Sequence, residues 1–185
     1  HMVARCLTST ALDVAVSTRM PNFDIHAFLD EPGRPAAVAT VTERGRPALA
    51  TMWFLFADGR LWFHSPVDKP APFLAAAAAG REVSVLVATF SPPHDVRQFR
   101  ASGPAALSSR DLTRVRRIYE RYVPEWSAFW REHATSDRFR LWSMLPDRGM
   151  AVAYPGLADA PVYRWSDPTE LERGEPEPAG SDADG

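Results

Sequence analysis

The hydrophobic residues in the middle of the chain recur with a period of two, and turn residues interrupt them at short intervals. The strands predicted from this pattern cover residues 36–42, 48–56, 61–65, 82–90, 96–107, 139–145 and 150–154. A turn at residues 45–47 separates the first two, and the Asp58-Gly59 pair is a strong hairpin signal between the second and third. The first three strands are therefore predicted to form an antiparallel meander.

Between these strands the hydrophobic period changes to that of a helix. Helices are predicted over residues 23–29, 72–79, 111–122 and 124–133. The third is the best defined, because Leu112, Val115 and Ile118 recur at helical intervals. Ser108 and Asp111 precede it with the spacing of a capping box. The chain is predicted to be mainly β with added helices.

Two of the predicted strands, residues 48–56 and 61–65, are apolar on both faces. In the first, Trp53 and Leu55 alternate with Met52 and Phe54. A sheet with one face in water would alternate apolar with polar residues, so both faces of this sheet are expected to be covered. For a small antiparallel barrel the outer cover must come from helices or from a second subunit, and we expect a homodimer.

Length and charge indicate one globular domain with polar ends. The 185 residues are 45% hydrophobic, which is enough for a single core. We expect an N-terminal arm, partly disordered, over residues 1–22, one domain over residues 23–165 with a helical insertion at about residues 109–134, and an acidic disordered tail over residues 166–185. The stripe formed by Arg114, Arg117 and Arg121 is predicted to be a solvated helix face.

Several classes of protein are excluded by what the sequence contains. Without the acidic tail the formal net charge is about +4, which suits a small-molecule substrate and not a nucleic acid. Cys6 is the single cysteine, so no disulfide can form within the chain, and a cytoplasmic location is expected. The sequence shows no membrane span and no signal peptide. The five histidines lack metal-ligand spacing, so no metal site is expected.

The best candidate for chemistry is Lys69, the one lysine in a chain with twenty arginines. It lies where the strand at residues 61–65 gives way to the alanine-rich helix at residues 72–79. The first turn of a helix has unpaired N–H groups and a partial positive charge, and an ammonium group at that position suits a phosphate or another anion.

The order of these elements and their local sequence resemble a known family. The relevant segments are AAVATVTERGRPALATMWFLFADGRLWFHS, the loop with Lys69, FLAAAAAG, EVSVLVATF and ASGPAAL, which lie between residues 36 and 107. They are similar to the split-barrel flavin-binding proteins related to pyridoxamine 5′-phosphate oxidase and to their deazaflavin-using relatives. The resemblance implies a split antiparallel β-barrel and a homodimer that binds FMN at the subunit interface and oxidises or reduces a small organic substrate.

The resemblance also implies a set of cofactor-binding residues. The second strand would contact the flavin ring, the third strand and the loop after it would hold the phosphate, and the fifth strand of the neighbouring subunit would add contacts. The positions that correspond are Thr51, Met52, Trp53, Phe54, His64, Ser65, Lys69, Pro70, Arg97 and Gln98. No catalytic acid or base is identified, because the flavin carries the redox chemistry in such enzymes.

One departure from the family pattern leaves alternatives open. Family members commonly have a second basic residue near the lysine, whereas this loop has Asp68. A deazaflavin coenzyme could replace FMN, with its phosphate and acidic tail bound by Arg97, Arg100 or the arginine stripe. A third possibility is a split barrel that has lost its flavin and binds haem or a pathway intermediate as a regulatory protein.

Overall fold

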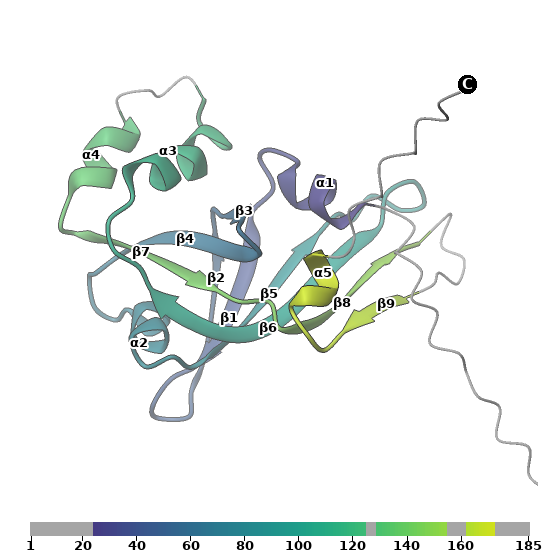
Figure 1. The fold of residues 1–185 in the computed structure, drawn as a ribbon, viewed down its shortest axis with the longest axis horizontal. Coiled ribbons are helices and arrows are strands. Elements are labelled where there is room, and N and C mark those ends of the chain that lie inside the picture. Colours follow the sequence, from purple (N-terminus) through teal and green to yellow (C-terminus); the bar gives the residue numbers. More distant parts are fainter. Residues whose placement is uncertain (1–23, 125–128, 155–161, 173–185) are drawn as a thin grey trace, which may run out of the picture.

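The computed structural model describes residues 24–124, 129–154 and 162–172 (Figure 1). The predicted N-terminal arm, residues 125–128 and the end of the acidic tail lie outside these residues. The strands are β1 (Ala36–Val41), β2 (Pro47–Met52), β3 (Leu55–Ala57), β4 (Arg60–Pro66), β5 (Glu82–Ala88), β6 (Arg97–Leu107), β7 (Phe139–Met144), β8 (Arg148–Ala153) and β9 (Val162–Trp165). The helices are α1 (Ile25–Asp30), α2 (Pro72–Ala78), α3 (Leu112–Glu120), α4 (Phe129–Thr135) and α5 (Thr169–Glu172).

The nine strands form one antiparallel sheet in the order β2-β1-β5-β6-β7-β4-β3, and β8 and β9 branch from β6. The branch exists because β6 changes partner along its length: Arg97–Ser102 pairs with β8, and Ala105–Leu107 pairs with β7. Gly103 lies at the change, and a Cβ there would overlap the Leu145 carbonyl. The predicted split antiparallel barrel is confirmed.

The predicted meander is wrong at its second strand. Residues 48–56 form two strands, because β2 pairs with β1 whereas β3 pairs with β4. The chain crosses between these partners at Trp53 and Phe54, and the Phe54 N–H donates to the Tyr122 hydroxyl at 3.1 Å. The hairpin at Asp58-Gly59 is confirmed, with φ of 54° and 67° as a type I′ turn requires.

Two hydrophobic clusters hold the helices on the sheet. The larger lies inside the half-barrel and includes Phe28 of α1 and Phe73 of α2. The smaller joins α3 and α4 to β3, β4 and β7 around Ile118 and Tyr119. Figure 1 shows α3 and α4 together at one end of the molecule and α2 at another. The cofactor residues predicted on β2 and β4 therefore lie between these two groups of helices.

The helical insertion differs from its prediction in three ways. Asp111 caps α3 by accepting from the Arg114 N–H at 2.9 Å, whereas Ser108 is not the cap. Residue 124 lies in a turn and not in a helix, and the described part of the next helix is Phe129–Thr135. The arginine stripe is not simply solvated: the Arg114 guanidinium lies 3.7 Å from the Trp62 ring centroid, and Arg121 donates to carbonyls of α1. Two of the three stripe arginines therefore hold the insertion on the barrel.

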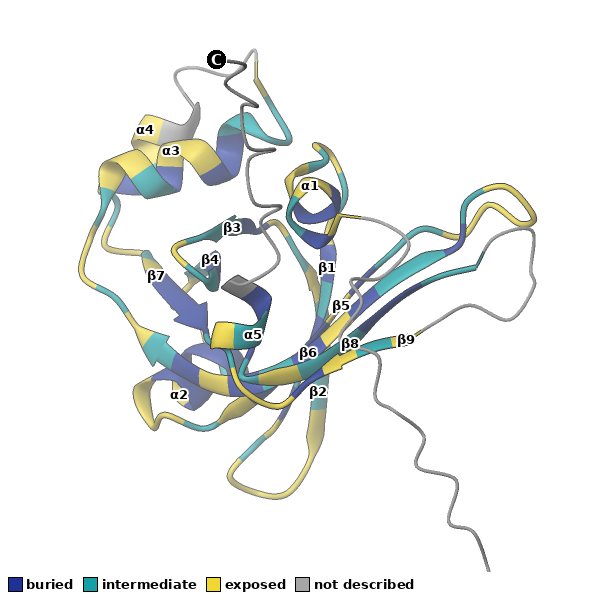
Figure 2. Cartoon of the chain, turned by 45° about the vertical axis from the view of Figure 1, so that its right-hand side comes forward, coloured by how far each residue is buried: buried dark blue, intermediate teal, exposed yellow. Residues whose placement is uncertain are grey.

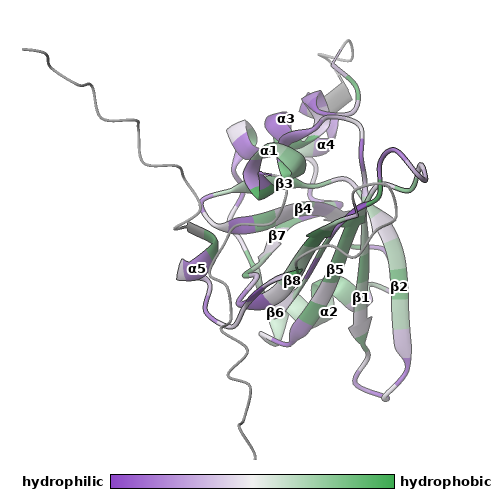
Figure 3. Cartoon of the chain, turned by 90° about the vertical axis from the view of Figure 1, so that its right-hand side faces the viewer, coloured by the Kyte–Doolittle hydropathy of each residue, from purple (hydrophilic) through white to green (hydrophobic). Residues whose placement is uncertain are grey.

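The sheet has one face on the core and one face that the described residues leave uncovered. Ala37 and Ala39 lie on the uncovered face, with Leu86 and Leu49 directly across from them on neighbouring strands. Leu49 is 76% exposed and Leu86 is 37% exposed. Figures 2 and 3 show β2 exposed at this side and hydrophobic residues along β1, β2 and β5. No helix in the described part of the chain supplies the outer cover that the sequence predicts.

The ordered structure extends past the predicted end of the domain. The strand β9 was not predicted, and α5 lies within the segment from residue 166 onward that was expected to be disordered. Leu171 of α5 is buried, and its carbonyl is 3.0 Å from His26 Nε2. The buried Leu171 side chain and contacts of the Glu170 and Leu171 carbonyls with Tyr163 and His26 dock this short helix, so disorder is wrong for residues 166–172.

Candidate cofactor site

A pocket of about 650 Å³ lies between the end of β2, the end of β4 and α3. We call it the aromatic pocket. Six of the ten predicted cofactor residues line it: Thr51, Met52, Trp53, His64, Ser65 and Pro70. Ile118 and Tyr119 of the helical insertion close one side. The structure therefore brings together the predicted ring-binding strand and part of the predicted phosphate-binding segment.

Trp53 gives this pocket a flat, apolar wall. Its ring stacks on Tyr122 with centroids 5.0 Å apart and meets Tyr119 edge-on at 5.6 Å. The side chain remains 38% exposed although it is held on two sides. A fixed aromatic surface of this kind suits a planar ligand, because its contact area costs little side-chain entropy.

His64 lies deeper in the aromatic pocket than Trp53 and is uncharged at neutral pH. Its Nδ1 is 3.2 Å from the Tyr119 hydroxyl. Burial, followed by the positive charges of His133 and Arg110, lowers the pKa of His64 to about 4. His64 can therefore exchange a hydrogen bond with a ligand, including the phosphate that the resemblance implies for this position, but it supplies no positive charge.

Ser65 is positioned by the core beneath it. Its Oγ accepts a hydrogen bond from Trp142 Nε1 at 2.9 Å. Trp142 is fully buried and stacks on Phe63 with ring centroids 4.5 Å apart. Because this contact uses the oxygen as an acceptor, the hydroxyl hydrogen stays available as a donor to a ligand.

The loop after β4 presents alternate residues to opposite sides. Asp68 lines the aromatic pocket and pairs with Arg138 at 3.3 Å. Lys69 lines a second cavity of about 910 Å³, which we call the basic cleft. No described residue forms an ion pair or a hydrogen bond with the Lys69 ammonium group. This cation is therefore available to an anion in the basic cleft.

The basic cleft contains the additional cations that the loop lacks. Its basic residues are Arg44, Arg46, Lys69, Arg81 and Arg140. One carboxylate, Glu43, lines it as well and lies 3.6 Å from Arg81. Arg81 Nε is buried without a hydrogen-bond partner among the described residues, and Arg140 is oriented by two carbonyls, including Phe139 O at 2.9 Å. The local charge favours a ligand with several negative groups.

The two cavities share a wall formed by Pro70, Ala71, Pro72 and Leu74. A ligand could therefore place a flat ring in the aromatic pocket and reach over this wall into the basic cleft. The sequence indicated that the start of α2 would help to bind the anion. Its contribution to anion binding is small, because α2 has seven residues and starts with Pro72, which has no N–H. Side chains, and chiefly Lys69, must hold the anion.

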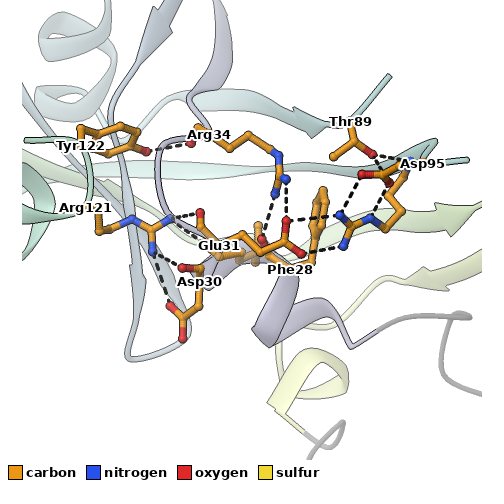
Figure 4. A network of polar contacts seen from close by, with 10 residues as sticks. Phe28, Asp30, Glu31, Arg34, Thr89, Asp95, Arg121 and Tyr122 are labelled. Carbon is orange, nitrogen blue, oxygen red and sulfur yellow. Dashed lines mark hydrogen bonds and ion pairs between the residues drawn. The ribbon is translucent and has the colours of Figure 1, made fainter. Parts of the chain in front are cut away.

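Three predicted cofactor residues lie away from both cavities. Phe54 is fully buried in the core. Arg97 is held by Asp95 and Glu31, with its closest contact at 2.6 Å to Glu31 Oε1 (Figure 4). These carboxylates raise the pKa of Arg97. Gln98 is half-buried between Ala88 and Val152 on β6. A contribution of Arg97 and Gln98 from a neighbouring subunit stays a prediction, and Arg97 would first have to leave two carboxylates.

Sequence reasoning missed Tyr119 and the arginines of the basic cleft. Tyr119 was within reach, because it follows Val115 by four residues on the predicted helix. Arg44 and Arg46 flank a predicted turn, so their exposure could be foreseen. Arg140 lies 71 positions after Lys69, and only the pairing of β7 with β4 brings them together.

The sequence also matches the model of a known protein family. The model of the pyridoxamine 5′-phosphate oxidase family matches residues 24–152. The chain belongs to the pyridoxamine 5′-phosphate oxidase family. No curated protein matches the sequence.

Solved structures share the fold of this family member at low sequence identity. The conserved hypothetical protein Rv2991 from Mycobacterium tuberculosis is 19% identical, with a TM-score of 0.59 over 89% of this chain and 96% of that chain. HutZ, the haem storage protein from Vibrio cholerae, is 18% identical, with a TM-score of 0.56 over 71% of this chain and 93% of that chain. Such likeness supports the fold alone.

The described residues also lack two further features. They contain no group of three or more His, Cys, Asp or Glu side chains placed to hold a metal ion. None of the helices in the same part of the chain has the length and hydrophobicity that crossing a membrane needs.

Proposed function

We propose that this protein is an FMN-dependent oxidoreductase that acts on a small organic substrate. The observation that carries the proposal is the shared wall between the aromatic pocket and the basic cleft. A flavin ring would lie against Trp53, and the phosphate would reach Lys69 beyond Pro70. The bound flavin would supply hydride transfer, and the protein residues would orient the ring and the substrate.

The absorbance spectrum of the purified protein, followed by titration with FMN and with riboflavin, tests this function. FMN should bind with quenching of its fluorescence, and riboflavin should bind more weakly because it lacks the phosphate. A colourless protein that changes the fluorescence of neither compound would overturn the proposal. A Soret band in the same spectrum would instead point to haem, which HutZ, with the same fold, stores.

A second candidate, a deazaflavin-dependent reductase, is favoured by the charge of the basic cleft. Its five cations and one carboxylate exceed what a single phosphate dianion needs. A deazaflavin coenzyme with an acidic tail would use cations of the cleft besides Lys69, such as Arg44 and Arg46. Titrations with FMN and with the deazaflavin coenzyme at the same ionic strength distinguish the two functions. The coenzyme that binds more tightly is the one that the cleft fits.

The uncovered face of the sheet supports a homodimer as part of this proposal. Leu49 lines both the aromatic pocket and a groove of about 980 Å³ on that face. A second copy that covers the face would therefore also border the cofactor site. Sedimentation should show a dimer for the wild type and a monomer for Leu49→Asp, whereas Leu112→Asp, at an exposed leucine of α3, should remain dimeric. A monomeric wild type would contradict this part of the proposal.

A further inference from the structure

His64 forms part of the wall between two cavities. On one side is the aromatic pocket, and on the other is a smaller cavity of about 390 Å³, which we call the polar pocket. The polar pocket is lined by His64, Ser108, Ser109, Arg110, Asp137 and Arg140, among others. His64 is therefore the one imidazole among the described residues that lines both cavities.

The ring of His64 is held in one orientation. Phe139 stacks on it with centroids 5.3 Å apart, and Tyr119 meets it edge-on at 5.9 Å. Nδ1 is 3.2 Å from the Tyr119 hydroxyl, and no described residue forms a hydrogen bond with Nε2. Tyr119 itself lines the aromatic pocket. The pair thus connects the aromatic pocket, through two side chains, to an imidazole that also lines the polar pocket.

The contact between these side chains works in both tautomers of a neutral ring. With Nδ1 protonated, His64 donates to the Tyr119 oxygen, and with Nε2 protonated, the Tyr119 hydroxyl donates to Nδ1. The charged and titratable groups around the ring are Tyr119 of α3, His133 of α4, and Arg110 and Asp137, which pair with each other at 2.7 Å. Burial of the ring, together with the positive charge of Arg110, keeps His64 neutral and able to change tautomer.

We propose that His64 and Tyr119 carry a proton from the polar pocket to an acceptor reduced in the aromatic pocket. This rests on the proposed oxidoreductase function, which supplies the hydride. A carbonyl or quinone acceptor that gains a hydride develops negative charge on its oxygen, and the Tyr119 O–H gives that oxygen a proton. As His64 Nδ1–H reprotonates Tyr119, Nε2 takes a proton from a water molecule in the polar pocket, and the hydroxide that remains is released to the solvent.

The net change is one proton moved from water to the acceptor, which leaves as the alcohol or hydroquinone, and His64 ends in its other tautomer. Exchange with water restores the first tautomer. Tyr119 is the group that touches the acceptor, whereas His64 acts through Tyr119. The chemical class of substrate that fits is therefore a flat carbonyl compound or quinone, whose oxygen points at the hydroxyl of Tyr119.

Stopped-flow oxidation of the reduced FMN-loaded protein by menadione, in H₂O and in D₂O, tests the relay. The wild type should react more slowly in D₂O. Tyr119→Phe and His64→Gln should each lower the rate about 10²-fold, as is typical when a positioned general acid is removed. Each should also abolish the solvent isotope effect. The double variant should be no slower than the slower single variant, since both act in one path.

Matched controls and a second readout separate the relay from a structural role. Tyr163→Phe removes a tyrosine hydroxyl bonded to Glu170 O, outside these cavities, and should keep the wild-type rate and isotope effect. The FMN dissociation constant should stay within about fivefold in Tyr119→Phe, because the relay concerns proton delivery and a single net hydrogen bond is worth about 1 kcal/mol. In the protein without FMN, the ¹⁵N shifts of His64 should report a neutral ring at pH 7.

The outcomes distinguish this inference from the proposed function. If FMN binds and the wild type reduces menadione, but both variants keep its rate and isotope effect, the relay is wrong and the function stands. A charged His64 at pH 7 would also overturn the relay. If the wild type binds no FMN, the proposed function fails and the relay fails with it.

Discussion

Asp68 and Lys69 are neighbours in the sequence, but the loop turns their side chains into different cavities. Asp68 borders the aromatic pocket and pairs with Arg138, whereas Lys69 faces the basic cleft. From the sequence alone, the carboxylate beside the lysine argues against a phosphate site. The structure removes that objection, because the Asp68 charge is on the other side of the loop and is partly neutralised.

The first prediction concerns these two residues. Lys69→Ala should weaken FMN binding by roughly 10- to 100-fold, since a hydrogen bond to a charged group is worth about 1.5–3 kcal/mol. Riboflavin binding should not change, because riboflavin has no phosphate. Fluorescence titration of both ligands measures this. Asp68→Asn is the matched control and should change FMN affinity only a few-fold; a larger loss there than in Lys69→Ala would contradict the assignment.

The second prediction concerns the charge of the basic cleft. Arg44→Gln and Arg46→Gln should weaken binding of a deazaflavin coenzyme with an acidic tail more than binding of FMN, because the tail extends past Lys69. The loss should shrink as salt is added, as expected for partly exposed charges. Titrations at two ionic strengths measure it. Arg116→Gln, at an exposed arginine paired with Glu120, should leave both affinities unchanged. Equal losses for the two coenzymes would exclude tail recognition by these arginines.

Sequence patterns predicted the fold well where the evidence is local. The strand at residues 82–90 and the hairpin at Asp58-Gly59 depend on alternation and on a two-residue turn, and both are present. The separation of β2 from β3 at Trp53 could not be predicted. The hydrophobic pattern of residues 48–56 continues without a break, and the two strands differ only in the strand with which each one pairs. The helix α5 was missed because its docking depends on one buried leucine in an acidic segment.

The cofactor site was also predictable where its residues lie close together in the sequence. Thr51, Met52, Trp53, His64 and Ser65 lie on two neighbouring segments that the family pattern identifies. The side of the loop on which Lys69 lies depends on the backbone path through Pro66 and Pro70, which sequence spacing does not give. The arginines of the basic cleft come from three separate segments, so only the folded sheet collects them.

The third prediction tests the division of the sheet at Gly103. A Cβ on this residue would overlap the Leu145 carbonyl, which is backbone and cannot move aside cheaply. Gly103→Ala should therefore destabilise the protein by about 1–3 kcal/mol or more. Urea unfolding followed by circular dichroism measures the change. Ser102→Ala, at the preceding position, should cost less because it removes only a half-buried hydroxyl contact with Ser84. Similar losses in the two variants would contradict the proposed overlap.

The last prediction concerns the ion-pair network that holds α1 against β6 (Figure 4). Hydrogen bonds from Arg97 and Thr89 lower the pKa of Asp95 to about 2, below its ordinary 3.8. Between these values the unfolded chain binds more protons, so the contribution of Asp95 is complete above pH 3.8 and is lost as the pH falls toward 2. Because Asp95 is partly exposed, Asp95→Asn should cost about 1 kcal/mol at neutral pH.

Urea unfolding at pH 6 and near pH 2 measures this pH dependence. The wild type should be more stable than Asp95→Asn at pH 6, and the difference should shrink near pH 2, where the native carboxyl begins to protonate. Asp137→Asn removes a carboxylate from an exposed ion pair with Arg110 and should lose little at either pH. A difference between wild type and Asp95→Asn that stays constant or grows on acidification would mean that Arg97 does not hold Asp95 in its charged form, and that packing around Phe28, against which the Arg97 guanidinium lies at 4.8 Å, fixes α1 instead.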